Sequence, residues 1–201
     1  MRCLYCDKKI NKITIQSILL EEDMLCIECR KSLKVNRKYV YIDELKVETL
    51  YNYDEGLFKD FLIQYKECFD EALAPIFLYL LKDYIRYKYF GYKLLFVPSR
   101  KEKIESRGFN HLEKVFESLK MPIIYGLSMK QELAQEGKNL SDRRSMIDNY
   151  TYSGKPLNKV LIVDDVITSG SSIKGIYKAI KPHACSVRAL TLARKENAFI
   201  K

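Results

Sequence analysis

Two adjacent carboxylates followed by a hydroxyl-rich loop are the residues of this chain best suited to chemistry. The apolar run 160–163 ends in Asp164 and Asp165, and the loop Val166-Ile167-Thr168-Ser169-Gly170-Ser171-Ser172 then leads into a helical pattern. Backbone N–H groups and hydroxyls at the positive end of a helix favour a phosphate. The neighbouring acids can accept hydrogen bonds from ribose hydroxyls or hold a hydrated Mg²⁺. Residues 160–172 therefore predict a pocket for a phosphorylated sugar.

Four cysteines near the N-terminus have the spacing of a metal site. They form two CxxC pairs with 19 residues between the pairs: Cys3, Cys6, Cys26 and Cys29. This spacing is typical of four-cysteine zinc sites, in which four thiolates close the coordination sphere and the Zn²⁺ is structural. Two redox CxxC motifs are the alternative, but neither pair follows a strand–helix thioredoxin pattern. The isolated Cys68 and Cys185 are predicted to be ordinary buried thiols.

A basic loop follows a second buried-strand pattern. Residues 94–97 are apolar, and Pro98 leads into Ser99, Arg100 and Lys101. A strand that runs into a turn with a hydroxyl and two cations suits a diphosphate. Ligands of open α/β sheets collect at the carboxyl ends of strands. We therefore expect the two loops to serve one sugar that carries a phosphate at one end and a diphosphate at the other.

The charge of the chain favours polyanion partners. Its 35 Lys and Arg exceed its 26 Asp and Glu, and the formal net charge is +9. Residues 84–90 mix aromatic side chains with cations, which suits stacking and phosphate contacts with single-stranded nucleic acid. An amphipathic helix with inward tyrosines is the alternative for this segment. The basic residues around the cysteines likewise leave open whether the zinc module contacts DNA or only staples a subdomain.

Strand patterns alternate with helical patterns along most of the chain. Strand patterns occur within 40–53 and at 94–97, 122–125 and 187–193, besides the run before Asp164. Helical patterns occupy 57–66, 69–90, 112–119 and 171–180. This alternation predicts an α/β fold with a doubly wound, mostly parallel sheet.

The domain organisation and compartment follow from the same patterns. We expect a zinc module at 1–40 and a sheet domain at 41–201, with a mobile flap within the polar segment 131–150. No run approaches the roughly 18 uncharged apolar residues of a membrane span. Because Met1 leads directly into charged and cysteine-rich sequence, we expect no secretory leader and a cytoplasmic protein.

Taken together, these motifs resemble a known family. Residues 160–172 resemble the 5-phosphoribosyl-1-diphosphate (PRPP) signature of type I phosphoribosyltransferases. The whole chain is similar to the ComF/ComFC-type competence proteins, in which a four-cysteine zinc module precedes a phosphoribosyltransferase-like domain. Besides the CxxC pairs and the Asp-Asp loop, the resemblance rests on Lys66, Val97-Pro98, Arg107-Gly108-Phe109-Asn110, Gln135 and Arg143-Arg144.

The resemblance implies roles for individual residues. Asp164 and Asp165 would hold the ribose hydroxyls and, indirectly, Mg²⁺, while residues 168–172 would cradle the 5′-phosphate. The basic loop, Ser99 with Arg100 and Lys101, would approach the diphosphate. The cations that would close over the ligand as a flap are Arg107, Arg143 and Arg144.

Three functions remain open at this point. The first is natural transformation, with handling of incoming single-stranded DNA in the cytoplasm and binding of PRPP with Mg²⁺. The second is an active phosphoribosyltransferase of nucleotide salvage; no acid or base for a nucleobase is evident, but such a reaction needs little side-chain chemistry. The third is a PRPP-sensing adaptor for a protein partner, such as a helicase or another competence protein.

Overall fold

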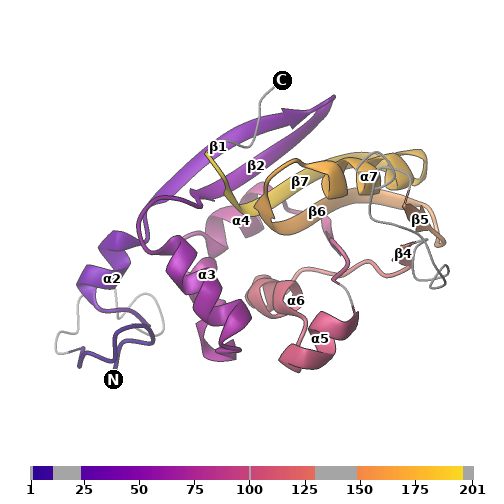
Figure 1. Ribbon diagram of the computed structural model, residues 1–201. Helices are drawn as coiled ribbons and strands as arrows, with labels where there is room; N and C mark the ends of the chain where they lie inside the picture. The colour runs from indigo at the N-terminus through magenta and orange to yellow at the C-terminus, as the bar shows by residue number, and fades with distance from the viewer. Residues whose placement is uncertain (1, 11–23, 100, 130–148, 197–201) are drawn as a thin grey trace.

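A five-stranded sheet organises the described part of the chain, which comprises residues 2–10, 24–99, 101–129 and 149–196 of the computed structural model (Figure 1). The strands lie in the order β1 (Val35–Ile42), β2 (Leu45–Asn52), β7 (Ala184–Arg194), β6 (Leu157–Ile167) and β3 (Lys93–Phe96). The last four run parallel, and β1 pairs antiparallel with β2 in a hairpin. The predicted α/β fold with a mostly parallel sheet is confirmed.

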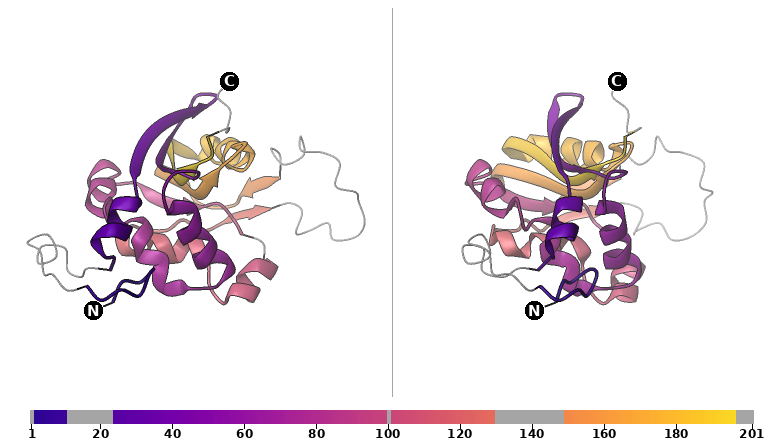
Figure 2. Two further views of the ribbon diagram at one scale, coloured as in Figure 1. Left: turned by 60° about the vertical axis from the view of Figure 1, so that its left-hand side comes forward. Right: turned by 90° about the vertical axis from the view of Figure 1, so that its left-hand side faces the viewer.

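Helices cover both faces of this sheet (Figure 2). One face packs against α3 (Phe58–Glu67), the 3₁₀ segment η1 (Glu71–Phe77), α4 (Lys82–Lys88) and α6 (His111–Phe116). The other face packs against α7 (Ser171–Ile180). Residues 160–163 of β6 are fully buried because the strand is covered on both sides, which is why it is a continuous apolar run in the sequence.

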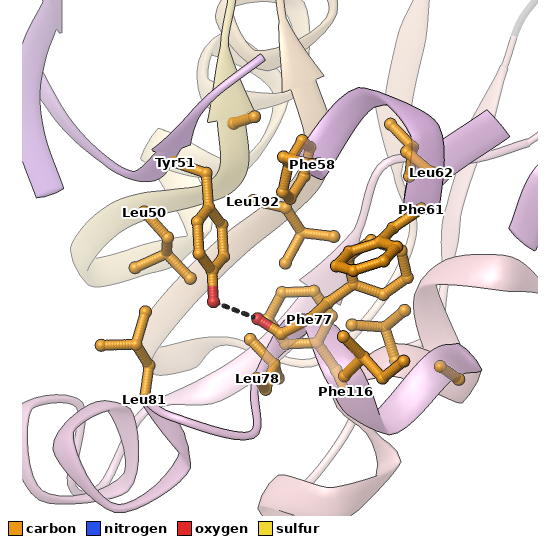
Figure 3. Close-up of a cluster of buried hydrophobic side chains, with 14 of the residues drawn as sticks. Leu50, Tyr51, Phe58, Phe61, Leu62, Phe77, Leu78, Leu81, Phe116 and Leu192 are labelled. Carbon is orange, nitrogen blue, oxygen red and sulfur yellow. Dashed lines mark hydrogen bonds between the residues drawn. The ribbon is translucent and has the colours of Figure 1, made fainter. Parts of the chain in front are cut away.

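The larger core ties β2 to the helices on the first face. Figure 3 shows Tyr51 of β2 pointing between Leu50 and Phe58 toward η1. The Tyr51 hydroxyl donates to the carbonyl of Phe77 at 3.0 Å, and its ring stacks on Phe58 with centroids 4.9 Å apart. Because a buried phenol needs an acceptor, this bond sets the position of η1 against the sheet and thereby helps place α3 and α6.

Shorter elements complete the fold. They are α2 (Ile27–Ser32), α5 (Lys101–Arg107), the 3₁₀ turns η2 (Glu117–Leu119) and η5 (Lys181–His183), and the antiparallel pair β4 (Leu127–Met129) and β5 (Tyr150–Tyr152). The predicted flap lies almost wholly outside the described residues, between β4 and β5. None of the described helices is long and apolar enough to cross a bilayer.

Two predicted elements differ from those observed. The helical pattern at 69–90 is divided into η1 and α4, and Pro75 lies inside η1, where its ring supplies no N–H for an α-helical bond. The predicted strand at 122–125 is reduced to an isolated bridge between Ile123 and Leu94. Gly126, at φ 102°, then turns the chain into β4, so the pairing ends after one bridge.

Candidate functional site

The loop after β6 joins the end of a strand to the N-terminus of a helix through a glycine turn. Gly170 adopts φ 67° and is the N-cap of α7, a ten-residue helix. A side chain at this position would be strained, and its Cβ would lie 2.7 Å from Cδ1 of Ile42. Thr168 and Ser169 are exposed before the helix, and the Ser169 and Ser171 hydroxyl oxygens lie 2.9 Å apart. Hydroxyls and a helix N-terminus therefore meet at the carboxyl edge of the sheet, as the sequence predicts.

The two acids at the end of β6 have different surroundings. Successive residues of a strand point to opposite faces, and Asp165 faces α3 and α6. Its Oδ2 atom accepts from the Lys66 ammonium at 2.5 Å and from Nε2 of His111 at 2.8 Å. Only 15% of the Asp165 side chain is exposed. Their place at a strand end predicts exposed acids, but Asp164 and Asp165 are both partly buried.

His111 links Asp165 to two of the predicted site residues. With a proton on Nε2 donated to Asp165, Nδ1 is left as an acceptor. Nη1 of Arg107 lies 3.4 Å from Nδ1, and Oγ of Ser99 lies 3.5 Å away. Arg107 also donates from Nε to the carbonyl of Lys66 at 3.0 Å. The structure thus gathers Ser99, Arg107 and Asp165, which sequence reasoning placed in one site, around a histidine.

Sequence reasoning assigned no role to His111 and quoted Lys66 only as part of the resemblance. Lys66 lies 99 residues before Asp165, and His111 lies 54 residues before it. No local spacing could join them. The nearest sequence signal is Asn110, whose side chain accepts from the N–H of Leu112 and caps α6, because an N-cap marks the next residue as the start of a helix.

Burial and charge shift the pKa values of the two carboxyl groups in opposite directions. Burial, reinforced by the negative charge of Asp165, raises the pKa of Asp164 to about 8. Burial alone would also raise the pKa of Asp165, but His111 and Lys66 outweigh it and hold that pKa well below its usual range. At neutral pH the site therefore has one protonated and one ionised carboxyl group, and a bound cation would favour ionisation of both.

The carboxyl pair fits a hydrated divalent cation better than a fully protein-bound one. Asp164 Oδ1 accepts from the N–H of Asp165 at 2.9 Å, and Asp165 Oδ1 accepts from the N–H of Val166 at 2.6 Å. Few carboxylate oxygens remain for direct coordination. Mg²⁺ commonly keeps several waters and takes one or two carboxylates together with substrate phosphates, so this donor set is compatible with Mg²⁺ carried by a phosphorylated ligand.

Of the remaining predicted residues, only some lie in the described part of the chain. Lys101 is the first residue of α5, close in sequence to Ser99. Arg100, Arg143 and Arg144 lie outside the described residues, as does Gln135. Their predicted roles at the diphosphate and in the flap stay predictions.

The four N-terminal cysteines form a compact cluster that fits a metal ion. Their sulfur atoms all lie within 4.8 Å of one another: Cys3, Cys6, Cys26 and Cys29. The sulfurs of Cys6 and Cys26 are 3.7 Å apart, close to the ~3.8 Å edge of a tetrahedron with Zn–S bonds of about 2.3 Å. Four sulfur donors gathered this closely suit Zn²⁺.

The cysteine cluster is fastened to the first face of the sheet domain. Cys3, Cys26 and Cys29 are buried in the larger core, and the ring of Tyr5 meets that of Phe61 in α3 edge-on at 4.5 Å. Because α3 also carries Lys66, the metal module and the acidic site share one supporting helix. Cys68 and Cys185 lie elsewhere and are both exposed, so their predicted burial is wrong.

Comparison with known proteins gives similarity over nearly the whole chain. The chain is 24% identical over 222 residues to the protein named Competence protein ComFC of Streptococcus pneumoniae (strain ATCC BAA-255 / R6), a match that covers 96% of this chain and 100% of that protein. It is 24% identical over 212 residues to Competence protein ComFC of Bacillus subtilis (strain 168), covering 96% of this chain and 83% of that protein. No family model matches. These similarities support a ComFC-type protein, and the four-cysteine cluster of the chain fits a zinc module.

Proposed function

We propose that this chain is a natural-transformation factor that binds PRPP with Mg²⁺ at the carboxyl edge of its sheet and handles single-stranded DNA in the cytoplasm. The similarity to two proteins named for competence supports the biological role. The ligand is argued from the site. The zinc module at 1–40 serves as a structural attachment to the phosphoribosyltransferase-like domain at 41–201.

The observation that carries the PRPP proposal is the continuity of β6, the Gly170 turn and α7. This segment offers a phosphate the hydroxyls of residues 168–172 and the positive end of a helix. In β6, just before this turn, Asp164 and Asp165 can accept hydrogen bonds from two ribose hydroxyls. Mg²⁺, when bound with the ligand, would neutralise its diphosphate, and Ser99 and Arg107, which lie beside His111, would approach that group.

Without a ligand, Asp165 is hydrogen-bonded to Lys66 and His111. Both donate to the same oxygen, Oδ2. A ribose hydroxyl that donates to Asp165 would compete with these two bonds, so we expect PRPP to loosen them. Lys66 is then freed to approach a phosphate oxygen, and the buried His111 stays neutral because burial lowers its pKa.

Titration calorimetry with PRPP and Mg²⁺ tests the ligand. The wild-type chain is expected to bind, and Asp164→Asn with Asp165→Asn is expected to abolish binding. Asp83→Asn, which removes one exposed carboxylate from the distant α4, is the matched control and should bind as the wild type does. PRPP binding that persists in the double variant would show that the ligand lies elsewhere.

The metal is tested separately. Cys3→Ser is expected to lose Zn²⁺ and to destabilise the N-terminal module, because metal binding in small modules is folding free energy. Cys68→Ser changes an exposed cysteine outside the cluster and should keep the metal. Full stoichiometric zinc in the Cys3 variant, measured by elemental analysis, would contradict the four-cysteine site.

His111 favours transferase activity as a second candidate function. In such a reaction the bond between the anomeric carbon and the diphosphate breaks, a bond to an acceptor nitrogen forms, and the acceptor gives up a proton. A neutral imidazole beside the ribose-binding acid is a group that can take this proton. Release of diphosphate from PRPP with a panel of nucleobases tests it. Binding without release by any base would favour a PRPP-sensing role, including that of an adaptor.

A further inference from the structure

A cavity of about 270 Å³ lies away from the phosphate loop, where α4 meets the sheet. Its walls come from β1, β2, α4 and β7, and they combine cations with tyrosine rings. We call it the cation–tyrosine cavity and define it by Tyr39, Lys46, Glu48, Lys88, Tyr89 and Arg188. Three positive charges face a single carboxylate here.

The carboxylate of Glu48 is already hydrogen-bonded to protein side chains. Its side chain is 1% exposed. Oε1 accepts from the hydroxyl of Tyr84 at 2.7 Å, while Oε2 accepts from the hydroxyl of Tyr89 and the ammonium of Lys88, both at 2.7 Å. This carboxylate fixes the wall of the cavity and has little capacity left for a ligand.

The other two cations are directed to the cavity without an acidic partner. The Lys46 ammonium lies 3.9 Å from the centroid of the Tyr39 ring. Arg188 lies across from Lys46, since Val47 pairs with Ala189 in the parallel register. Among the described residues neither cation forms a salt bridge. Cations held side by side without counter-charges attract an anion.

Exposed tyrosines extend the surface beyond the cavity. Tyr39 is 47% exposed and Tyr41 is 61% exposed, although aromatic side chains usually bury their rings. They alternate along β1, so they share one face, and Tyr41 pairs with Lys46 across the hairpin. Flat rings beside cations provide the two contacts that single-stranded nucleic acid uses, base stacking and phosphate pairing.

The cavity is separate from the acidic site. Arg188 pairs with Leu161 of β6, four residues before Asp165, which places the two positions about 13 Å apart along the sheet. A strand bound at the cavity would therefore not have to occupy the phosphate loop.

We propose that the cation–tyrosine cavity and the adjoining face of β1 bind single-stranded DNA, with phosphates on Lys46 and Arg188 and bases stacked on Tyr39 and Tyr41. The proposal rests on the DNA-handling part of the proposed function and is independent of PRPP binding. An acidic protein segment could pair with the same cations, but its carboxylates would make no use of the two exposed tyrosine faces, on which bases stack. The rings therefore favour nucleic acid.

Fluorescence anisotropy with a labelled oligothymidylate across a salt series tests the proposal on the full-length, zinc-loaded chain. Lys46→Gln with Arg188→Gln is expected to weaken binding at least tenfold. It should also reduce the slope of log K against log salt by about 1.4, since each lost phosphate contact on a single strand contributes about 0.7. Tyr41→Ala, which removes an exposed ring, is expected to weaken binding about tenfold with the slope unchanged.

Matched controls separate this surface from general charge. Lys155→Gln with Lys178→Gln removes the same charge from two exposed positions, one before β6 and one on α7, and should bind DNA as the wild type does. Circular dichroism on every variant shows whether the fold is intact, and PRPP calorimetry shows whether the acidic site is unchanged.

Each remaining outcome would overturn one part of the scheme. Wild-type binding that none of the cavity variants weakens would place the DNA elsewhere and refute this inference alone. No binding by the wild type would refute DNA handling itself. Competition by polyglutamate as strong as that by the oligonucleotide, with Tyr41→Ala without effect, would identify an acidic protein as the occupant and refute the inference.

Discussion

Asp165 and Glu48 are two carboxylates that take a lysine partner in different settings. Asp165, at the end of β6, accepts from Lys66 at 2.5 Å and from His111 at 2.8 Å, and its side chain is 15% exposed. Glu48, in the middle of β2, accepts from Lys88 at 2.7 Å and from two tyrosine hydroxyls, and it is 1% exposed. The first is bound by groups that a ligand can replace, whereas the second is itself almost fully buried and also accepts from two tyrosine hydroxyls.

The difference separates a binding acid from a structural one. At the carboxyl edge, a hydroxyl or a cation that replaces Lys66 finds the carboxylate already ionised and oriented. Around Glu48, displacement would leave buried phenols without an acceptor, which costs about 1–3 kcal/mol for each unsatisfied group. We therefore expect substitution of Glu48 to affect stability most, and substitution of Asp165 to affect ligand binding most.

Glu48→Ala should produce the largest loss of stability. It removes the acceptor of Tyr84 and Tyr89 and leaves Lys88 without its carboxylate, so we expect about 3–5 kcal/mol less free energy of unfolding. Urea denaturation followed by circular dichroism measures it. Glu48→Gln keeps the shape and one acceptor oxygen and should lose less. A loss below about 1 kcal/mol for the alanine variant would remove the distinction between the two carboxylates.

Asp165→Asn should cost less stability than Glu48→Ala but should abolish PRPP binding. An amide oxygen can still accept from His111, but Lys66 loses its counter-charge, so we expect a loss of about 1–3 kcal/mol in the free energy of unfolding together with loss of PRPP binding. Denaturation and calorimetry on the same sample measure both. Unchanged affinity for PRPP would assign Asp165 a structural role like that of Glu48.

Asp164→Asn, unlike the two substitutions above, should increase the free energy of unfolding. Burial raises the pKa of Asp164 to about 8 from a usual value of 3.8. Between these values the folded chain holds a proton that the unfolded chain releases, so this group lowers stability as the pH rises through that window. The variant should therefore be about 1–3 kcal/mol more stable than the wild type near pH 8, with a smaller difference near pH 5. Equal pH profiles for the two proteins would show that Asp164 is not buried as a neutral acid.

Much of the site was predictable where its chemistry is contiguous in the chain. The loop from Asp164 to Ser172 and helix α7 follow from residue order alone, and the four-cysteine cluster follows from CxxC spacing. What was missed is tertiary: Lys66 and His111 reach Asp165 only because α3 and α6 pack on the same face of the sheet. Hydrophobic pattern identifies such helices but does not give their rotation about the sheet.

Residues 84–90 are a second case in which the sequence pattern does not indicate the tertiary partners. The interpretation with inward tyrosines holds for two of the rings, and the nucleic-acid interpretation of this segment stays a prediction. Tyr84 and Tyr89 turn inward to Glu48, whereas Tyr87 is 87% and Phe90 is 83% exposed. The inward pair depends on an acid 36 and 41 residues earlier, which no periodicity within the helix could indicate.

His111→Gln should have the smallest effect and is informative for that reason. Burial lowers the pKa of His111 below 6.5, although Asp165 opposes the shift and Lys66 and Arg107 reinforce it. The unfolded chain therefore takes up a proton first as the pH falls below about 6.5, and the folded state loses stability there. Glutamine does not titrate, and its amide can donate to Asp165.

At neutral pH the His111→Gln variant should match the wild type within about 1 kcal/mol and should retain PRPP binding. Between about pH 6.5 and 5.5 its stability should fall less steeply than that of the wild type. Both proteins share every other titrating group, including the cysteine cluster, so the difference between their profiles isolates His111. Profiles that fall in parallel would contradict the lowered pKa of His111, and a wild-type profile that falls less steeply than the variant's would mean that His111 is already charged beside Asp165. In that case the imidazole would act as a second cation like Lys66, and the site would have no neutral base to offer an acceptor.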